Sequence, residues 1–362
     1  MTELRYSQQQ ITEEDTAAVV SALRSPWLTQ GPKVEEFEEA LAKYVGAKYA
    51  VAVSSGTAAL HLALLSVGDN EHFWTSPLSF VATANAVSLG GNHVDFYDVD
   101  SVTGSAMLGK ADWALPVHFA GRAAPLIGEP TRTIEDACHA LGAMDFDGCS
   151  RVGSCKHSLM TCFSFHPVKP ITTGEGGAIT LNDLGLARAL RQLRSHGRDP
   201  ETGNMVRLGP NYRMTEMQAA LGLSQLRRCD EMRDRRAALV VAYYRAIANL
   251  RDGGTPRDLW LPEVNDDDEW PTRSWHLYAA RITGGRRDEV KAKLNAAGIG
   301  AQIHYSPVIP LQPYYRNRYG YKPGDFPNAE AWAAEELSLP LHAGMTEDDV
   351  VRVVAELRKA LA

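Results

Sequence analysis

Apolar positions follow helical spacing in some segments of the chain and the spacing of buried strands in others. Residues 11–25 have the pattern of an amphipathic helix, with Thr12 as its expected N-cap. The next segment carries apolar residues three or four positions apart and predicts a helix that ends near Gly46, a residue suited to a left-handed cap. The expected apolar stripe of the first helix consists of Val19, Val20 and Leu23.

Residues 49–53 predict a buried strand that runs directly into a further helix. More strands are expected at residues 93–99, 112–119, 131–135, 160–165 and 177–181. Helical segments separate several of these strands, as a largely parallel sheet covered on both faces requires. A long helix is expected over residues 227–250. The pattern therefore predicts an α/β fold.

The composition changes after residue 250. Residues 251–272 are rich in Asp, Gly and Pro, which predicts a linker or loop. The elements expected after it are a strand near 276–282, a helix over about 287–297, a second strand near 301–305 and two closing helices, the last beginning at Thr346. We therefore expect a large α/β domain over residues 1–250 and a small C-terminal α+β domain over residues 251–362.

Composition narrows the class of protein. The 362 residues suggest two domains, and 37 basic against 44 acidic residues give a net charge of −7, which argues against a surface that coats nucleic acid. The sequence contains no run of 18 apolar residues, so no membrane span is expected. Its polar start of mixed charge is not that of a signal peptide. The five cysteines lack C-x-x-C spacing, so we expect reduced thiols in a cytoplasmic protein rather than disulfides or a metal site.

The first segment with candidate chemistry is Ser54-Ser55-Gly56-Thr57, between a predicted strand and a helix. Small residues let the backbone approach a ligand closely, and the start of a helix offers free N–H groups to an anion such as phosphate. Thr57 adds a hydroxyl group. The alternative is a tight connection that binds nothing.

The second segment is Ile134-Glu135-Asp136-Ala137-Cys138-His139. Its apolar strand ends in a carboxylate at the expected carboxyl edge of the sheet, where open α/β folds bind ligands. A buried Asp136 would pair with a protonated ring nitrogen and keep it charged. Alternatively, Asp136 caps the next helix and His139 is a core histidine.

The third segment places Lys169 between two prolines, before the glycine-rich run Gly174-Glu175-Gly176-Gly177. A desolvated lysine has a lowered pKa and a free amine for covalent chemistry with a carbonyl group. Ser164 lies five residues earlier and is placed to reach the same ligand. The alternative is an ordinary solvated lysine.

The fourth segment is Gly209-Pro210-Asn211-Tyr212-Arg213-Met214, before a predicted helix. Asn211 and Arg213 at a junction of loop and helix suit recognition of phosphate or carboxylate. The alternative is a capped turn with a surface arginine.

Further segments complete an ordered series along the chain. They are residues 27–32, 76–85, 195–197, 304–305 and 337–341. Together with the four segments above, this series resembles the sugar aminotransferases of the DegT/DnrJ/EryC1/StrS family over nearly the whole chain. The resemblance implies fold type I, pyridoxal 5′-phosphate as the cofactor, and transfer of an amino group to a keto sugar.

The resemblance also implies roles for single residues around the cofactor. Lys169 matches the lysine that binds the cofactor covalently and later carries the proton, and Asp136 matches the partner of the pyridinium nitrogen. Phe80 matches an aromatic residue on the ring face, and His139 a position near the ring. The phosphate cradle that the resemblance implies consists of Gly56, Thr57 and Ser164.

Other matches concern the neighbouring subunit and the substrate. Asn211 matches a residue that reaches the cofactor phosphate of the neighbouring subunit, which implies a homodimer with shared active sites. The residues implied to contact the nucleotide-sugar substrate are Tyr6, Pro26, Trp27, Leu28, Thr29, Arg213, His304 and Tyr305.

Some details are similar to the family branch that makes precursors of pseudaminic acid. That branch moves an amino group, here expected from L-glutamate, to the C4 keto group of a UDP-linked 4-keto-6-deoxy-N-acetylhexosamine. The segment from Asp98 to Ala114 departs from the family pattern, since it is short, rich in Gly and Ser, and not expected to form the usual helix. The alternatives are a dTDP- or GDP-linked keto sugar, a keto-cyclitol, or a non-catalytic binding protein of the same fold.

Overall fold

The computed structural model describes residues 3–107, 109, 111–125, 132–248, 258–262 and 272–362. Its strands are β1 (Tyr49–Val53), β2 (His72–Thr75), β3 (His93–Phe96), β4 (Trp113–Leu115), β5 (Arg132–Asp136), β6 (Met160–Ser164), β7 (Gly177–Leu181), β8 (Leu259–Trp260), β9 (Tyr278–Ile282) and β10 (Glu336–Leu339). Its helices are α1 (Glu13–Leu23), α2 (Pro32–Val45), α3 (Gly56–Leu65), α4 (Ala82–Leu89), α5 (Leu184–Arg194), α6 (Glu216–Leu226), α7 (Cys229–Ala248), α8 (Arg287–Ala296), α9 (Pro313–Tyr319), α10 (Pro327–Glu335) and α11 (Glu347–Leu361). None of the described helices is long and apolar enough to cross a membrane.

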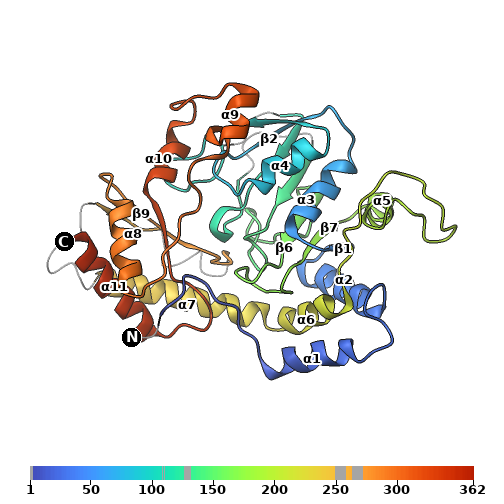
Figure 1. Ribbon diagram of the computed structural model, residues 1–362, viewed down its shortest axis with the longest axis horizontal. Coiled ribbons are helices and arrows are strands. Elements are labelled where there is room, and N and C mark those ends of the chain that lie inside the picture. Colours follow the sequence, from blue (N-terminus) through green and yellow to red (C-terminus); the bar gives the residue numbers. More distant parts are fainter. Residues whose placement is uncertain (1–2, 108, 110, 126–131, 249–257, 263–271) are drawn as a thin grey trace.

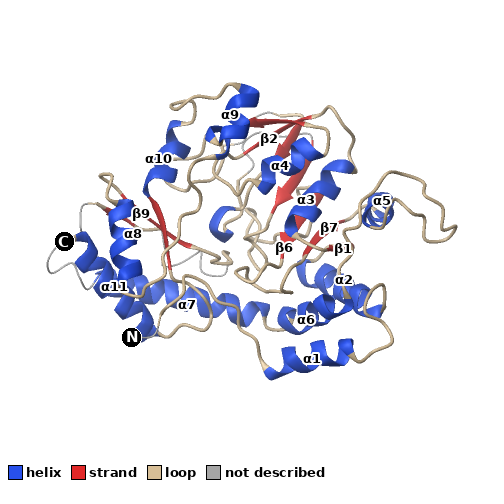
Figure 2. Cartoon of the chain, viewed as in Figure 1, coloured by secondary structure: helices blue, strands red, loops and turns tan. Residues whose placement is uncertain are grey.

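The larger sheet has seven strands in the order β1-β7-β6-β5-β4-β2-β3 (Figures 1 and 2). β7 runs antiparallel to both of its neighbours, and all other neighbouring pairs are parallel. This is the mostly parallel sheet that the sequence predicts. β2 is not among the strands predicted from the sequence.

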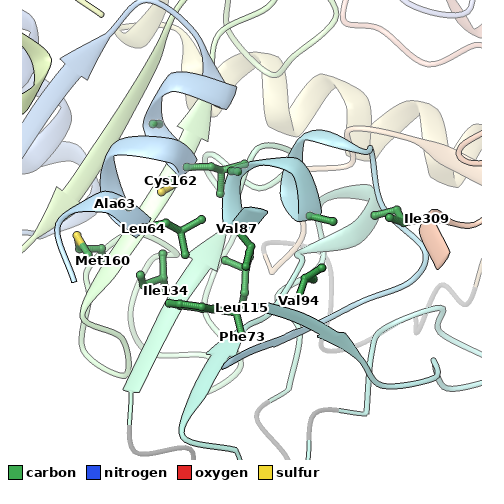
Figure 3. Packing of buried hydrophobic residues seen from close by; sticks show 14 of the residues in the cluster. Ala63, Leu64, Phe73, Val87, Val94, Leu115, Ile134, Met160, Cys162 and Ile309 are labelled. Atoms are coloured by element: carbon green, nitrogen blue, oxygen red, sulfur yellow. The ribbon is translucent and has the colours of Figure 1, made fainter. Parts of the chain in front are cut away.

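Helices cover both faces of the large sheet, as predicted. Val51 and Val53 of β1 pack in the core that includes residues of α3 and α4, whereas Ala50 and Ala52 pack in a second core with residues of α2 and α6. Because side chains alternate between the two faces of a strand, a strand buried on both sides is apolar throughout. Figure 3 shows Leu64 of α3 and Val87 of α4 beside residues of the strands.

The smaller sheet is antiparallel, in the order β10-β9-β8. It shares a core with α7, α8 and α11, in which the rings of Tyr243 and Tyr278 stack at 4.5 Å between centroids. The N-terminal segment joins this part of the molecule, since the Leu4 N–H donates to the Gly298 carbonyl at 2.9 Å. The predicted boundary after residue 250 and most of the predicted linker lie outside the described residues, so the division into two domains stays a prediction.

Several local predictions are confirmed. Thr12 caps α1 and Thr346 caps α11, each in a capping box with the aspartate three positions on. Gly46 ends α2 in the left-handed region, with φ +84°. The described residues between Asp98 and Ala114 contain no helix. All five cysteines are free.

The apolar stripe predicted for α1 does not form a buried face of the helix. Val20 and Leu23 are 37% and 57% exposed. The helix instead buries Asp15, whose Oδ2 accepts hydrogen bonds from Gln225 and Arg228, each at 2.7 Å. The buried Asp15 carboxylate thus fixes α1 on α6, and Val20 and Leu23 lie on the outer side of the helix.

Two strand predictions are also corrected. Residues 301–305 form no strand, only one bridge between Gln302 and Ser338, because the His304 N–H donates to the Glu336 side chain instead of a neighbouring backbone. The strand predicted over 112–119 covers only β4, since Pro116 follows it and has no N–H to pair. Three helices rather than two close the described chain, with β10 between the last two.

Candidate active site

A cavity of about 410 Å3 opens beside the carboxyl ends of β5 and β6 and the first turn of α3. This is the edge at which open α/β sheets bind ligands. The predicted residues that line it are Tyr6, Gly56, Thr57, Phe80, Asp136, His139, Ser164, Lys169, His304 and Tyr305. Three of the four segments with candidate chemistry therefore meet in one place with Tyr6, Phe80 and residues 304–305.

Lys169 stands in the loop that follows β6 and lines the cavity. Its backbone N–H donates to the His166 carbonyl at 2.9 Å, which closes a tight turn. Burial lowers the pKa of the Lys169 amine, and the nearby Cys138 thiol and Asp136 carboxylate only partly oppose that effect. A lowered pKa leaves more of the amine neutral, and the neutral amine is the form that attacks a carbonyl group.

Asp136 ends β5 with only 5% of its surface exposed. Its Oδ2 accepts a hydrogen bond from the Thr83 hydroxyl at 2.7 Å, and its Oδ1 accepts one from the Cys138 N–H at 3.2 Å. The Ser79 hydroxyl lies 2.8 Å from that of Thr83. Because Thr83 gives its hydrogen to Asp136, Ser79 must donate to Thr83. The carboxylate is held in place at the wall of the cavity, where it suits a protonated ring nitrogen.

The first turn of α3 forms an anion cradle. Ser55 caps the helix, its hydroxyl accepting from the Ala58 N–H at 3.1 Å, while the first N–H groups of a helix have no acceptor within it. A Cβ at Gly56 would lie 2.7 Å from the Ser164 Cβ, so only glycine permits this approach of α3 to β6. Phosphate at a helix start is a common arrangement, and the cradle, the buried carboxylate and the lysine fit pyridoxal phosphate.

Imidazole and phenol groups cover another side of the cavity. The Tyr305 hydroxyl lies 3.1 Å from His139 Nε2, and the His139 ring lies 4.3 Å from that of His276. Burial lowers the pKa of both histidines well below the usual range, so both rings are neutral at physiological pH. His139 Nδ1 is buried and has no hydrogen-bond partner among the described residues.

Six predicted residues lie outside this cavity, namely Pro26, Trp27, Leu28, Thr29, Asn211 and Arg213. Their two segments are neighbours, since Thr29 pairs with Thr215. Arg213 donates to the Ser195 hydroxyl at 2.9 Å and lines a separate surface hollow of about 680 Å3. Within one chain, therefore, none of these six residues lines the cavity around Lys169, although the Ser54 N–H beside the first turn of α3 donates to the carbonyl of the intervening Tyr212 at 2.9 Å.

The sequence alone did not single out several further lining residues, among them Ser79, Thr83, Cys138 and His276. The first three lie within segments that the resemblance already marks, so a search of those segments for buried polar groups would have found them. His276 has no local signal, because it reaches the cavity only through the packing of the C-terminal part on the large sheet.

Comparison with known proteins agrees with this geometry. The model of the DegT/DnrJ/EryC1/StrS aminotransferase family matches residues 9–358. The UDP-4-amino-4,6-dideoxy-N-acetyl-beta-L-altrosamine transaminase of Campylobacter jejuni is 35% identical over 370 residues, covering 96% of this chain and 94% of the relative. The UDP-4-amino-4-deoxy-L-arabinose–oxoglutarate aminotransferase of Shewanella sediminis is 35% identical over 384 residues, covering 96% and 95%.

A solved structure extends the likeness to the fold. Helicobacter pylori PseC, an aminotransferase involved in the biosynthesis of pseudoaminic acid, matches with a TM-score of 0.87 at 30% identity and covers 99% of both chains. The match over almost the full length includes the seven-stranded sheet and the small antiparallel sheet. The chain belongs to the DegT/DnrJ/EryC1/StrS aminotransferase family and is a pyridoxal phosphate-dependent sugar aminotransferase of fold type I.

Proposed function

We propose that this chain, acting in the cytoplasm, moves an amino group from L-glutamate to the C4 keto carbon of a UDP-linked 4-keto-6-deoxy-N-acetylhexosamine, for the synthesis of a surface glycan. The observation that carries the proposal is that Lys169 and Asp136 line one cavity with the anion cradle at Gly56. The relatives named above act on UDP-linked amino sugars by their names, which supports the nucleotide and sugar class.

The residues of the cavity divide the work around the cofactor. Bound pyridoxal phosphate supplies an electron sink that stabilises negative charge on a substrate carbon. Lys169 holds the cofactor covalently and then accepts and returns the proton, for which its lowered pKa is suited. Asp136 would keep the ring nitrogen protonated, and Phe80, 56% exposed at the cavity wall, would contact the ring.

The sugar nucleotide is assigned to the side of the cavity formed by Tyr6, His304 and Tyr305. The rings of Tyr6 and His304 lie 5.7 Å apart, and those of Phe80 and Tyr305 lie 5.9 Å apart. Burial lowers the pKa of His304 to about 4, so its imidazole is neutral and recognises the substrate by hydrogen bonds rather than by charge.

We further propose a homodimer in which each chain completes the site of the other. Asn211 and Arg213 do not line the cavity of their own chain, in agreement with a role in the partner's site. Apolar side chains near the same segments are exposed, among them Leu23 at 57%, Trp27 at 54% and Leu208 at 85%. A second copy of the chain would bury them, as exposed apolar patches usually require.

The main experiment follows the cofactor by its absorption. The purified holoenzyme should show a visible band that borohydride shifts, that L-glutamate bleaches, and that Lys169→Ala abolishes. UDP-, dTDP- and GDP-linked keto sugars are then supplied with glutamate, and the products are identified by mass spectrometry. A protein that stays colourless with pyridoxal phosphate contradicts the proposal, and amination of only a dTDP- or GDP-linked sugar corrects the substrate.

Complementation tests the shared site. Lys169→Ala and Asn211→Ala should each be inactive alone, but co-expressed chains should form mixed dimers that hold one intact site. Half of the dimers are mixed and half of their sites are intact, so about a quarter of the wild-type activity is expected. Activity no higher than that of the single variants would show that Asn211 serves its own chain or no site.

A further inference from the structure

A buried carboxylate and a hydroxyl group stand behind His304 on the side away from the cavity. Glu336 and Ser338 both belong to β10 and have no exposed surface. Glu336 Oε2 accepts a hydrogen bond from the His304 backbone N–H, and Glu336 Oε1 accepts one from the Ser338 hydroxyl at 2.6 Å. The same Ser338 Oγ lies 2.9 Å from His304 Nδ1. A continuous chain of hydrogen bonds thus links Glu336 to the imidazole ring.

The charge of Glu336 decides the direction of the two hydrogen bonds that link its Oε1, the Ser338 hydroxyl and His304 Nδ1. An ionised carboxylate only accepts, so Ser338 donates its single hydrogen to Glu336. Ser338 Oγ must then accept from His304, which places the imidazole hydrogen on Nδ1. A neutral imidazole has one N–H, so Nε2 is a bare acceptor in this state.

Protonation of Glu336 reverses the direction of the hydrogen bonds through Ser338. Oε2 is occupied by the His304 backbone N–H, so the acid hydrogen is on Oε1 and is donated to Ser338 Oγ. Ser338 then gives its own hydrogen to His304 Nδ1. The imidazole hydrogen must therefore be on Nε2, which becomes a donor.

We propose that Glu336, acting through Ser338, decides which ring nitrogen of His304 carries the hydrogen, and so whether the cavity meets a hydrogen-bond donor or an acceptor at Nε2. Glu336 and Ser338 are positioning residues, because only His304 lines the cavity. As a donor, His304 suits a carbonyl or phosphate oxygen of the substrate, and as an acceptor it suits a hydroxyl or amide N–H. This assignment of substrate groups rests on the proposed function, whereas the coupling of the three residues does not.

The groups around Glu336 allow its carboxyl group to ionise near neutral pH. Burial raises the pKa of Glu336 to about 8, and the opposing effects are the two hydrogen bonds and the charge of Arg287 from α8. Arg281 of β9 lies opposite Glu336 in the sheet, and its guanidinium forms an ion pair with Glu335 at 2.6 Å. The Tyr305 phenol beside the carboxyl has a raised pKa and stays neutral.

His304 itself stays neutral while Glu336 titrates. Burial and the charge of Lys169 lower its pKa to about 4. The other imidazoles whose charge bears on it, His139 and His276, have pKa values well below the usual range and are neutral as well. The state of the ring is therefore a choice between two tautomers. At pH 7 we expect Glu336 to be protonated and His304 to offer Nε2–H.

The tautomer is read directly from the 15N chemical shifts of the imidazole, since a protonated and a bare ring nitrogen differ widely. The full-length protein is labelled with 15N-histidine, and the His304 signals are assigned by their loss in His304→Gln. Between about pH 6 and about pH 10, we expect the hydrogen to move from Nε2 to Nδ1, with a midpoint within about one unit of 8.

Three variants separate the coupling from a structural effect. Glu336→Gln donates from its amide where the protonated acid does, so His304 should keep Nε2–H at every pH. Ser338→Ala breaks the chain, so the tautomer should no longer follow the titration of Glu336. Glu36→Gln, an exposed carboxylate paired with Lys33 in α2, should behave like the wild type.

A His304 tautomer that does not change with pH in the wild-type protein would overturn the proposal, as would a change that persists in Glu336→Gln. Neither result depends on turnover. In the active enzyme, kcat/KM of the wild type should fall above the midpoint, while that of Glu336→Gln stays flat. Failure to aminate any keto sugar would refute the proposed function and leave the tautomer result untouched.

Discussion

Gly56→Ala tests the close approach on which the anion cradle depends. The added Cβ would lie 2.7 Å from the Ser164 Cβ, 3.0 Å from the Ser164 Oγ and 3.2 Å from the Cys138 Sγ. Carbon atoms in contact prefer about 3.5–4.0 Å, so α3 must move by roughly 1 Å. Ser164 cannot yield easily, because it is paired with Gly177 at the end of β6 and β7.

Two effects follow from this displacement. Overpacking of this kind costs about 1–3 kcal/mol, so we expect the free energy of unfolding of the cofactor-free protein to fall by about 2 kcal/mol. The N–H groups at the start of α3 also move away from the phosphate position. A loss of about 1.4 kcal/mol at that contact would weaken pyridoxal phosphate binding about tenfold.

Urea denaturation measures the first effect and a cofactor titration by absorbance measures the second. Ser164→Gly removes the two nearest of these three atoms, so Gly56→Ala should cost at least about 1 kcal/mol less in that background. Gly185→Ala is the matched control, because Gly185 is exposed at the start of α5 and its added Cβ would meet only the Asp183 side chain. Strictly additive single effects, or an unchanged stability of Gly56→Ala, would refute the reasoning.

Three further outcomes are expected. Glu38→Gln should lower the free energy of unfolding by about 3 kcal/mol in urea melts, because the buried Glu38 accepts hydrogen bonds from Arg191, Arg194 and the Ala52 N–H. The control is Glu36→Gln on the same helix, which removes an exposed ion pair and should change the free energy of unfolding by less than about 1 kcal/mol. Burial raises the pKa of Glu336 from 4.5 to about 8, so the folded state binds the proton of Glu336 more tightly than the unfolded state does. The free energy of unfolding should therefore decline by a few kcal/mol as pH rises from about 4.5 to about 8, and Glu336→Gln should lack this decline in the same melts. Thr83→Val removes a charge-assisted hydrogen bond to Asp136 and should cost about 1.5–3 kcal/mol in the same melts, whereas an unchanged midpoint would mean that the bond contributes nothing.

Predictions from the sequence succeeded where the signal is local. The caps at Thr12, Gly46 and Thr346 each depend on residues within one turn, and the structure has all three. The apolar strand that leads into Gly56 likewise needs only its own residues to be recognised. Burial failed as a local inference for α1, because the partner of Asp15 is more than 200 positions away in the chain.

The amino-acid sequence by itself determined the type of fold, the series of motifs and the candidate lysine and aspartate, because these depend on residue types at short, fixed spacings. Only the tertiary structure decided that Lys169 and Asp136 share a cavity, that Thr83 holds Asp136 from 53 positions away, and that His276 reaches the same place. The hydrogen-bond chain behind His304 is also tertiary, since a carboxylate loses its water and its usual pKa only when the folded chain encloses it.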